Sequence, residues 1–249
     1  MTAAPLRFVF DPIGEELAAA RRCEAQVFLE TYGNTAEEFE LEYGPYEAST
    51  GFMTVLEDDG EAVATARFIA AGPSGLKTLN DVGRIPWQVD GLRSARAAGV
   101  DPGRTWDIAT IAVRRGAGRG GLCASALYHG IISAAYANDI DFIVMIMDSR
   151  ARDLLSSLGM QTHALPGTKA GEYLGSESSI PLWANMNRAL NQQRKDSPDA
   201  YRLIFQGIGL DGITMPTDWI WRRRSEATSR VRRLSAAPVI PGGAEPASR

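Results

Sequence analysis

The chain of 249 residues has the composition of a globular protein with a full core, with 45 % hydrophobic and 22 % charged residues. Its two cysteines and two histidines argue against a disulfide framework or a cysteine-based zinc site, and we expect no metal. The net charge of −4 argues against general nucleic-acid binding, which requires a basic face. Neither a run of ~18 apolar residues nor a secretory leader is visible, so we expect a cytoplasmic protein without a membrane span.

The first part of the chain alternates between helical and β patterns. A short apolar run at 6–10 precedes residues 14–33, whose Ala, Leu and Glu content predicts a helix. Two β-rich runs follow at 51–58 and 61–70, and Asp59-Gly60 separates them. Because Asp-Gly favours a tight hairpin turn, these runs predict an antiparallel pair of strands.

A long connection at 71–103, rich in Gly, Pro, Asp and Arg, is expected to be partly irregular. The elements expected after it are a strand at 105–113, a helix at 121–138, a buried strand at 141–148, a short helix at 150–159 and an edge or bulged strand at 179–186. This order predicts an α/β layered fold with one mixed sheet.

Three regions are expected along the chain. Residues 1–186 form the body, and 187–234 form a mostly helical extension that packs on it. Residues 235–249 are expected to be disordered, because a run of Pro, Gly and Ala offers no apolar face to bury. Seven arginines lie between 222 and 249, and this basic run either contacts an acidic partner or a phosphate, or is a solvated tail.

The most specific segment is the glycine-rich stretch VRRGAGRGGL at 113–122, between a predicted strand and a predicted helix. Its glycines let consecutive N–H groups approach a ligand, and the helix that follows adds the positive end of its dipole. Arg114, Arg115 and Arg119 add charge at the rim. The stretch suits a phosphate or pyrophosphate, with a flexible turn as the alternative. It fits neither the Walker A pattern nor the Rossmann spacing.

A strand, a loop of the type Arg/Gln-x-x-Gly-x-Gly, a helix, a buried strand and another helix resemble the acyl-CoA-binding core of the GCN5-related N-acyltransferase (GNAT) superfamily. Further stretches are similar to its autoinducer synthase branch, which includes N-acyl amino acid synthases. These stretches are Val27-Phe28-Leu29-Glu30, Thr65-Ala66-Arg67-Phe68-Ile69, Trp106-Asp107-Ile108-Ala109, Leu154-Leu155-Ser156-Ser157-Leu158-Gly159-Met160 and Tyr173-Leu174-Gly175. The similarity covers roughly residues 10–186.

The resemblance implies a GNAT-like fold, with a mixed, mostly antiparallel sheet flanked by helices. It also implies that the chain binds acyl-CoA, or the phosphopantetheine arm of an acyl carrier protein, as a co-substrate, with no permanently bound cofactor. The residues implied in binding are Ile111, Val113, Arg115, Gly116, Gly118, Arg119, Gly120 and Gly121. The acyl group would pass to the amine of a small molecule or amino-acid-derived acceptor.

Three residues are candidates for catalysis. Asp107 is a general base for the incoming ammonium, because acyl transfer requires a neutral amine; alternatively it is exposed or ion-paired with Arg67 or Arg104. Glu30 is a second candidate for the same role, or a solvated helix acid. Arg67 either holds a substrate carboxylate by a bidentate contact or points outward from its strand. Strand alternation predicts one shared face for Asp107, Ala109, Ile111 and Val113, unless a bulge intervenes.

Four positions depart from the family patterns. Glu24 and Thr110 stand where the autoinducer synthase branch has arginines, and Asn34 stands where it has a tryptophan. Leu155 occupies the place where many acetyltransferases have a tyrosine that protonates the leaving thiolate, and Tyr128 or Tyr173 is the substitute within this chain. The alternative to a catalyst is a non-catalytic acyl-CoA-binding sensor or interaction domain on the same fold.

Overall fold

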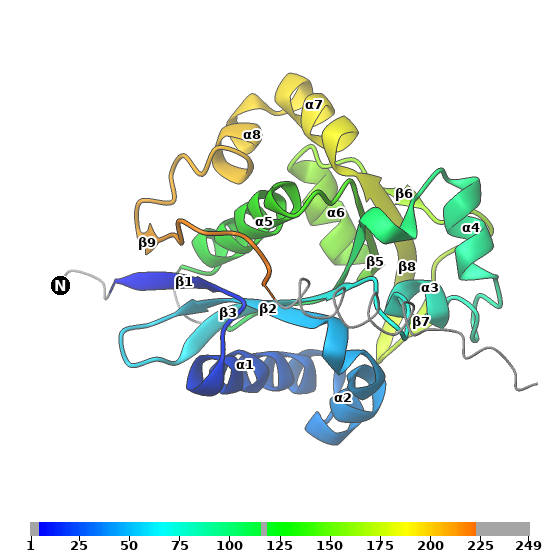
Figure 1. Ribbon diagram of the computed structural model, residues 1–249, viewed down its shortest axis with the longest axis horizontal. Coiled ribbons are helices and arrows are strands. Elements are labelled where there is room, and N and C mark those ends of the chain that lie inside the picture. Colours follow the sequence, from blue (N-terminus) through cyan, green and yellow to red (C-terminus); the bar gives the residue numbers. More distant parts are fainter. Residues whose placement is uncertain (1–4, 116–118, 223–249) are drawn as a thin grey trace, which may run out of the picture.

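The computed structural model describes residues 5–115 and 119–222, and Figure 1 shows a twisted sheet with helices on both faces. The sheet has nine strands in the order β6-β8-β5-β4-β3-β2-β1-β9, and β7 pairs with β8. The strands are β1 (Leu6–Phe10), β2 (Thr50–Leu56), β3 (Ala62–Ala70), β4 (Thr105–Val113), β5 (Phe142–Asp148), β6 (His163–Ala164), β7 (Gly171–Tyr173), β8 (Ser176–Asn185) and β9 (Ile213–Thr214). Only β4–β5 and β1–β9 are parallel neighbours among the described strands. The predicted mixed, mostly antiparallel sheet is confirmed.

The helices form two layers. On one face lie α1 (Gly14–Tyr32) and α2 (Ala36–Tyr43), and on the other lie α5 (Gly120–Ala137), α7 (Met186–Asp196) and α8 (Pro198–Ile204), as Figure 1 shows. The remaining helices are α3 (Lys77–Asp81), α4 (Gly91–Ala97), α6 (Ser149–Ser157) and two short 3-10 helices, η1 (Gly44–Ser49) and η2 (Pro102–Arg104). The connection at 71–103, expected to be partly irregular, thus contains two short helices. Asp90 caps α4, since its side chain accepts the Arg93 N–H at 2.9 Å.

The main core lies between the sheet and α5. Small residues on α5 let it approach the strands: Gly130 packs so closely that an added Cβ would lie 2.2 Å from the ring of Phe8. Aromatic rings pack together at the start of β4, where Trp106 stacks on Phe68 of β3 with 4.3 Å between the ring centroids. Trp221 meets both rings edge-on, so the chain beyond β9 contributes to this core.

Strand β4 contains a β-bulge that changes which residues share a face. Arg67 pairs with Thr110, but the next residue of β3, Phe68, pairs with Ile108, so Ala109 is the extra residue. The predicted alternation of Asp107, Ala109, Ile111 and Val113 on one face is therefore wrong beyond the bulge. Asp107 and Thr110 reach the α1 face, and Ile108 and Ile111 lie on the α5 face.

The parallel pairing of β4 with β5 is short. It joins Thr105–Asp107 to Phe142–Val144, while β5 stays paired with β8 along its whole length. In the described chain, the later residues of β4 and β5 have no pairing with each other. The two strands therefore separate just after Asp107.

The segment after β8 is helical over a shorter range than expected. The second of its two helices, α8, ends at Ile204. From there to Arg222 the described chain is extended or turned, apart from β9. Gly207 and Gly209 have φ values of +69° and +98°, which a continuing right-handed helix does not accommodate. The expectation of a mostly helical segment over 187–234 is therefore corrected for 205–222, and 223–234 lie outside the described residues. The predicted tail, 235–249, lies outside the described residues.

No helix among the described residues is long and apolar enough to cross a membrane.

Candidate active site

A buried ion pair lies on the α1 face of the sheet, between Glu24 of α1 and Arg67 of β3. Arg67 donates from Nε to Glu24 Oε1 at 2.9 Å and from Nη2 to Glu24 Oε2, and Thr110 also donates to Oε1. The Arg67 guanidinium carbon lies 4.1 Å from the centre of the Tyr43 ring. Burial would lower the pKa of Arg67, but the charge and hydrogen bonds of Glu24 outweigh it and raise that pKa. Arg67 is therefore charged and held inside the protein.

This geometry changes the interpretation of Arg67. The side chain neither points outward nor stands open, since it is 5 % exposed and Glu24 takes its bidentate contact. A substrate carboxylate would have to displace Glu24 to bind there. In this structure Arg67 instead joins β3 to α1 through Glu24.

Asp107 is completely buried where β4 and β5 separate. Its Oδ2 accepts the backbone N–H of Thr78 at 2.5 Å, and its Oδ1 accepts the Thr78 hydroxyl at 2.9 Å. Burial raises the pKa of Asp107 to about 7, against the opposing effect of the Thr78 hydrogen bonds. The carboxyl group therefore titrates near neutral pH. That is the range in which a general base works efficiently.

The suggested ion-pair partners of Asp107 are engaged elsewhere. Arg67 binds Glu24, and Arg104 Nε lies 2.9 Å from Asp141 Oδ2. Asp107 instead accepts a backbone N–H group in the first turn of α3, that of Thr78. The N-cap residue of α3, Leu76, makes no side-chain capping bond.

A second charged cluster adjoins Thr78. Lys77 Nζ lies 2.5 Å from Asp81 Oδ2 and 2.6 Å from Glu42 Oε2, and the Tyr173 hydroxyl donates to Asp81 Oδ2 at 2.5 Å. Lys77 and Asp81 are both buried, so each charge offsets the cost of removing the other from water. Burial first, and nearby acidic groups second, hold the pKa of Tyr173 well above its usual value. Tyr173 thus belongs to this cluster, on the same side of β4 as Asp107.

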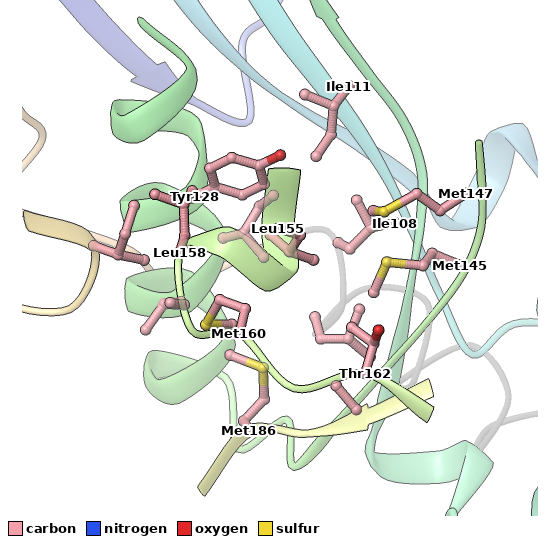
Figure 2. Close-up of a pocket in the computed structure, with 15 residues that line it drawn as sticks. Ile108, Ile111, Tyr128, Met145, Met147, Leu155, Leu158, Met160, Thr162 and Met186 are labelled. Atoms are coloured by element: carbon pink, nitrogen blue, oxygen red, sulfur yellow. The ribbon is translucent and has the colours of Figure 1, made fainter. Parts of the chain in front are cut away.

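An apolar cavity lies on the α5 face (Figure 2), with about 570 Å³ of empty space when its open side is included. It is bounded by β4, α5, β5, α6, the loop after α6, β8, α7 and α8. The lining residues are Ile108, Ile111, Tyr128, Ile131, Ile132, Ile143, Met145, Met147, Leu155, Leu158, Met160, Thr162, Ala184, Met186 and Ile204. The β4 and β5 members straddle the region where the two strands are unpaired.

Tyr128 is the aromatic residue in this lining. Figure 2 shows its hydroxyl directed toward the Ile111 end of the cavity. Burial raises the pKa of Tyr128, so the phenol is protonated at neutral pH and is able to donate a proton. Of the two tyrosines suggested as substitutes for the missing acid, Tyr128 lies in the cavity and Tyr173 lies in the charged cluster.

The glycine-rich segment is described only in part. Ile111 and Val113 pack against the main core on the α5 side, Arg115 is exposed, and Arg119 is the N-cap residue of α5. Gly116 and Gly118 lie outside the described residues.

Gly120 and Gly121 form the first turn of α5. A Cβ on Gly120 would meet Val113 at an ordinary 3.7 Å, and one on Gly121 would meet nothing within 4 Å. Neither glycine has a positive φ, so neither backbone conformation nor packing requires glycine there. Open space above the N–H groups of a helix N-terminus is what an anionic ligand needs.

Glu30 does not join the other candidates. It is exposed on α1, and its Oε1 accepts a hydrogen bond from Gln26 Nε2 at 2.9 Å.

Sequence reasoning missed Lys77, Thr78 and Asp81, although the spacing of Lys77 and Asp81 by four residues is a recognisable helical ion-pair signal. No group of three His, Cys, Asp or Glu side chains in the described ranges is arranged to hold a metal ion.

The fold is GNAT-like and similar to solved structures of the autoinducer synthase branch, as the resemblance predicts. The chain is similar to FeeM, an N-acyl amino acid synthase from uncultured soil microbes, at 16 % identity and a TM-score of 0.58, over 76 % of this chain and 96 % of that one. It is also similar to BjaI, a CoA-dependent acyl-homoserine lactone synthase solved with SAM and isopentyl-CoA, at 14 % identity and a TM-score of 0.56, over 91 % of this chain and 100 % of that one.

A third similar structure is the acyl-homoserine lactone synthase LasI, at 14 % identity and a TM-score of 0.54, over 79 % of this chain and 96 % of that one. No family model matches the chain, and no curated protein matches it by sequence. At these identities the likeness establishes the fold alone.

Proposed function

We propose that the protein transfers an acyl group from an acyl thioester to the amine of a small, amino-acid-derived acceptor. The observation that carries this proposal is the position of Asp107. Its carboxyl, with a pKa raised by burial to about 7, lies where β4 and β5 separate, and the apolar cavity occupies the opposite face of β4. FeeM, an N-acyl amino acid synthase, and BjaI and LasI, two acyl-homoserine lactone synthases, have a similar fold.

The cavity is the site for the acyl chain. Its lining is aliphatic and methionine-rich, and burial of methylene groups in such a lining gives roughly 0.8 kcal/mol each. The start of α5, with Arg115, Arg119, Gly120 and Gly121, would bind the pyrophosphate of CoA through helix N–H groups and positive charge. Acyl-CoA is the donor that suits these features, and acyl carrier protein is the competing donor to be tested.

The chemistry follows from the two faces of β4. The amine nitrogen attacks the thioester carbonyl carbon, the new C–N bond forms and the C–S bond breaks. Asp107 accepts the proton from the amine, directly or through a water, and Tyr128 donates a proton to the departing thiolate. Glu24 and Arg67 act as positioning residues, because they fix α1 against β3 and β4 on the face of the sheet where Asp107 lies and where the amine acceptor would bind.

The test starts from binding and proceeds to turnover. The purified protein is incubated with a panel of acyl-CoAs, free CoA and acyl carrier protein, and complexes are measured by native mass spectrometry. Thiol release is then followed against a set of amino acids and amines, with wild type and Asp107→Asn.

We expect acyl-CoA binding in both proteins and a turnover about 10²–10⁴-fold lower in the variant. Equal rates in the two would remove Asp107 from the mechanism. Binding of acyl-CoA without thiol release for any acceptor would favour a sensor. Failure to bind any acyl thioester would overturn the proposal.

A further inference from the structure

Part of the cavity wall comes from the chain after the strand–helix core. Met186, the first residue of α7, and Ile204, the last residue of α8, both line the cavity and are buried. Figure 2 shows Met186 at the end opposite Ile111, with Met160 and Thr162 near it. The α7–α8 segment therefore helps to form the wall that an acyl chain entering from the Ile111 end would meet.

The loop after α6 is fixed directly to α7. Gln193, which is completely buried on α7, donates from Nε2 to the Leu158 carbonyl at 2.9 Å. At Gly159, which has a φ of +74°, an added Cβ would lie 2.6 Å from Ser197 Oγ. The loop thus fits closely against the end of α7, and Leu158 and Met160 are held where they line the cavity.

Helix α8 is fixed in turn to α5. His129 Nδ1 lies 3.0 Å from the Ile204 carbonyl oxygen, and burial lowers the pKa of His129. Because a carbonyl oxygen only accepts hydrogen bonds, Nδ1 of the imidazole carries the hydrogen and donates to it. This contact fixes the backbone of the residue whose side chain lines the cavity.

We propose that the α7–α8 segment sets the length of the acyl chain the protein accepts, with Gln193 as the positioning residue of that wall. The inference rests on the proposed use of the cavity for the acyl chain. Each methylene buried in an apolar site improves affinity about fourfold, which corresponds to about 0.8 kcal/mol. This gain stops where the chain reaches the wall, so the position of the wall fixes the optimum length.

The experiment measures the affinity of straight-chain acyl-CoAs, in two-carbon steps, and of free CoA by titration calorimetry. Ile204→Ala enlarges the cavity, and we expect its optimum to move to a chain at least two carbons longer, with the long-to-short affinity ratio rising about tenfold. Gln193→Leu keeps the volume but removes the bond to Leu158, and we expect the length preference to flatten. Asn191→Ala, at an exposed position of α7, is the control. The affinity for free CoA should be the same in all four proteins.

Two further variants keep the test decisive if Ile204→Ala does not fold. Ile204→Val removes a single methylene and should move the preference in the same direction, and Ile204→Phe should move it to shorter chains. If the wild type prefers one length and these variants keep that preference, the segment does not set the length, while the proposed function stands. If the wild type binds neither acyl-CoAs better than free CoA nor acylated carrier protein better than the unacylated carrier, the cavity does not hold the acyl chain and the proposed function fails with it.

Discussion

Glu24 and Arg67 face each other across the contact between α1 and β3, joined by two hydrogen bonds and shielded from water on every side. Thr110, at the bulge of β4, donates a hydrogen bond to Glu24, so the ion pair also fixes the orientation of the Thr110 side chain. A buried charge whose partner is removed cannot recover its hydration, so such a pair is costly to break.

The first prediction concerns this pair. Glu24→Gln leaves Arg67 buried without a counter-charge, and we expect the free energy of unfolding to fall by about 3–5 kcal/mol in urea titrations. The matched control is Glu16→Gln, because Glu16 pairs with Arg7 at 2.8 Å on the surface. That change should cost less than about 1 kcal/mol. Similar losses in the two variants would show that burial adds nothing to the Glu24 contact.

The second prediction concerns the pH dependence of stability. The pKa of Asp107 is raised by burial from 3.8 to about 7 in the folded protein, so between these values the folded state binds the proton that the unfolded state has lost. Stability from this group is therefore fully present below pH 3.8 and is lost as the pH rises through 7. Relative to Asp107→Asn, the wild type should lose at most about 1.4 kcal/mol per pH unit in this window.

Thermal or urea unfolding of both proteins from pH 4 to pH 8 measures this difference. Subtracting the variant's curve from that of the wild type removes the contribution of the other titrating groups. A difference that rises with pH would mean that the Thr78 hydrogen bonds dominate and that Asp107 is an ordinary, ionised cap of α3.

The third prediction separates the two roles a glycine can have at the start of α5. Gly121→Ala adds a methyl group where nothing lies within 4 Å, and alanine is the better helix former by up to about 1 kcal/mol. We expect unchanged or slightly higher stability together with CoA affinity at least tenfold lower. Gly99→Ala is a contrasting control, because Gly99 has a φ of +74° and alanine there is strained. It should lose stability and keep CoA affinity once folded.

The order of elements, the hairpin and the mixed sheet were predictable because local signals such as Asp59-Gly60 and the apolar run at 141–148 agree with the fold. The bulge at Ala109 was not, since it inserts one residue without any glycine or proline to mark it. This single residue reverses the face of Ile111 and places Thr110 beside Glu24.

The site itself was predictable only where one residue stood out chemically. Asp107 is a carboxylate within a β-rich run, and that contrast identified it. Its partner Thr78 comes from a connection with no periodicity, and the pairing of Glu24 with Arg67 spans 43 positions of the chain. Contacts between such distant segments depend on the packing of α1 and α3 on the sheet, which no local pattern encodes.

The last prediction concerns Tyr128 as the acid that protonates the leaving thiolate. Tyr128→Phe keeps the ring in the cavity lining and removes only the hydroxyl, so acyl-CoA affinity should stay the same while kcat falls by roughly 10²-fold or more. A thioester of an acidic aromatic thiol needs no protonation to leave, so with that donor the variant should regain most of the wild-type rate. Tyr136→Phe is the control, because the Tyr136 hydroxyl donates to Asn187 at 2.6 Å on the surface of α5. An equal deficit with both donors would assign Tyr128 to packing rather than to proton transfer, because only a proton-transfer role depends on the basicity of the leaving group.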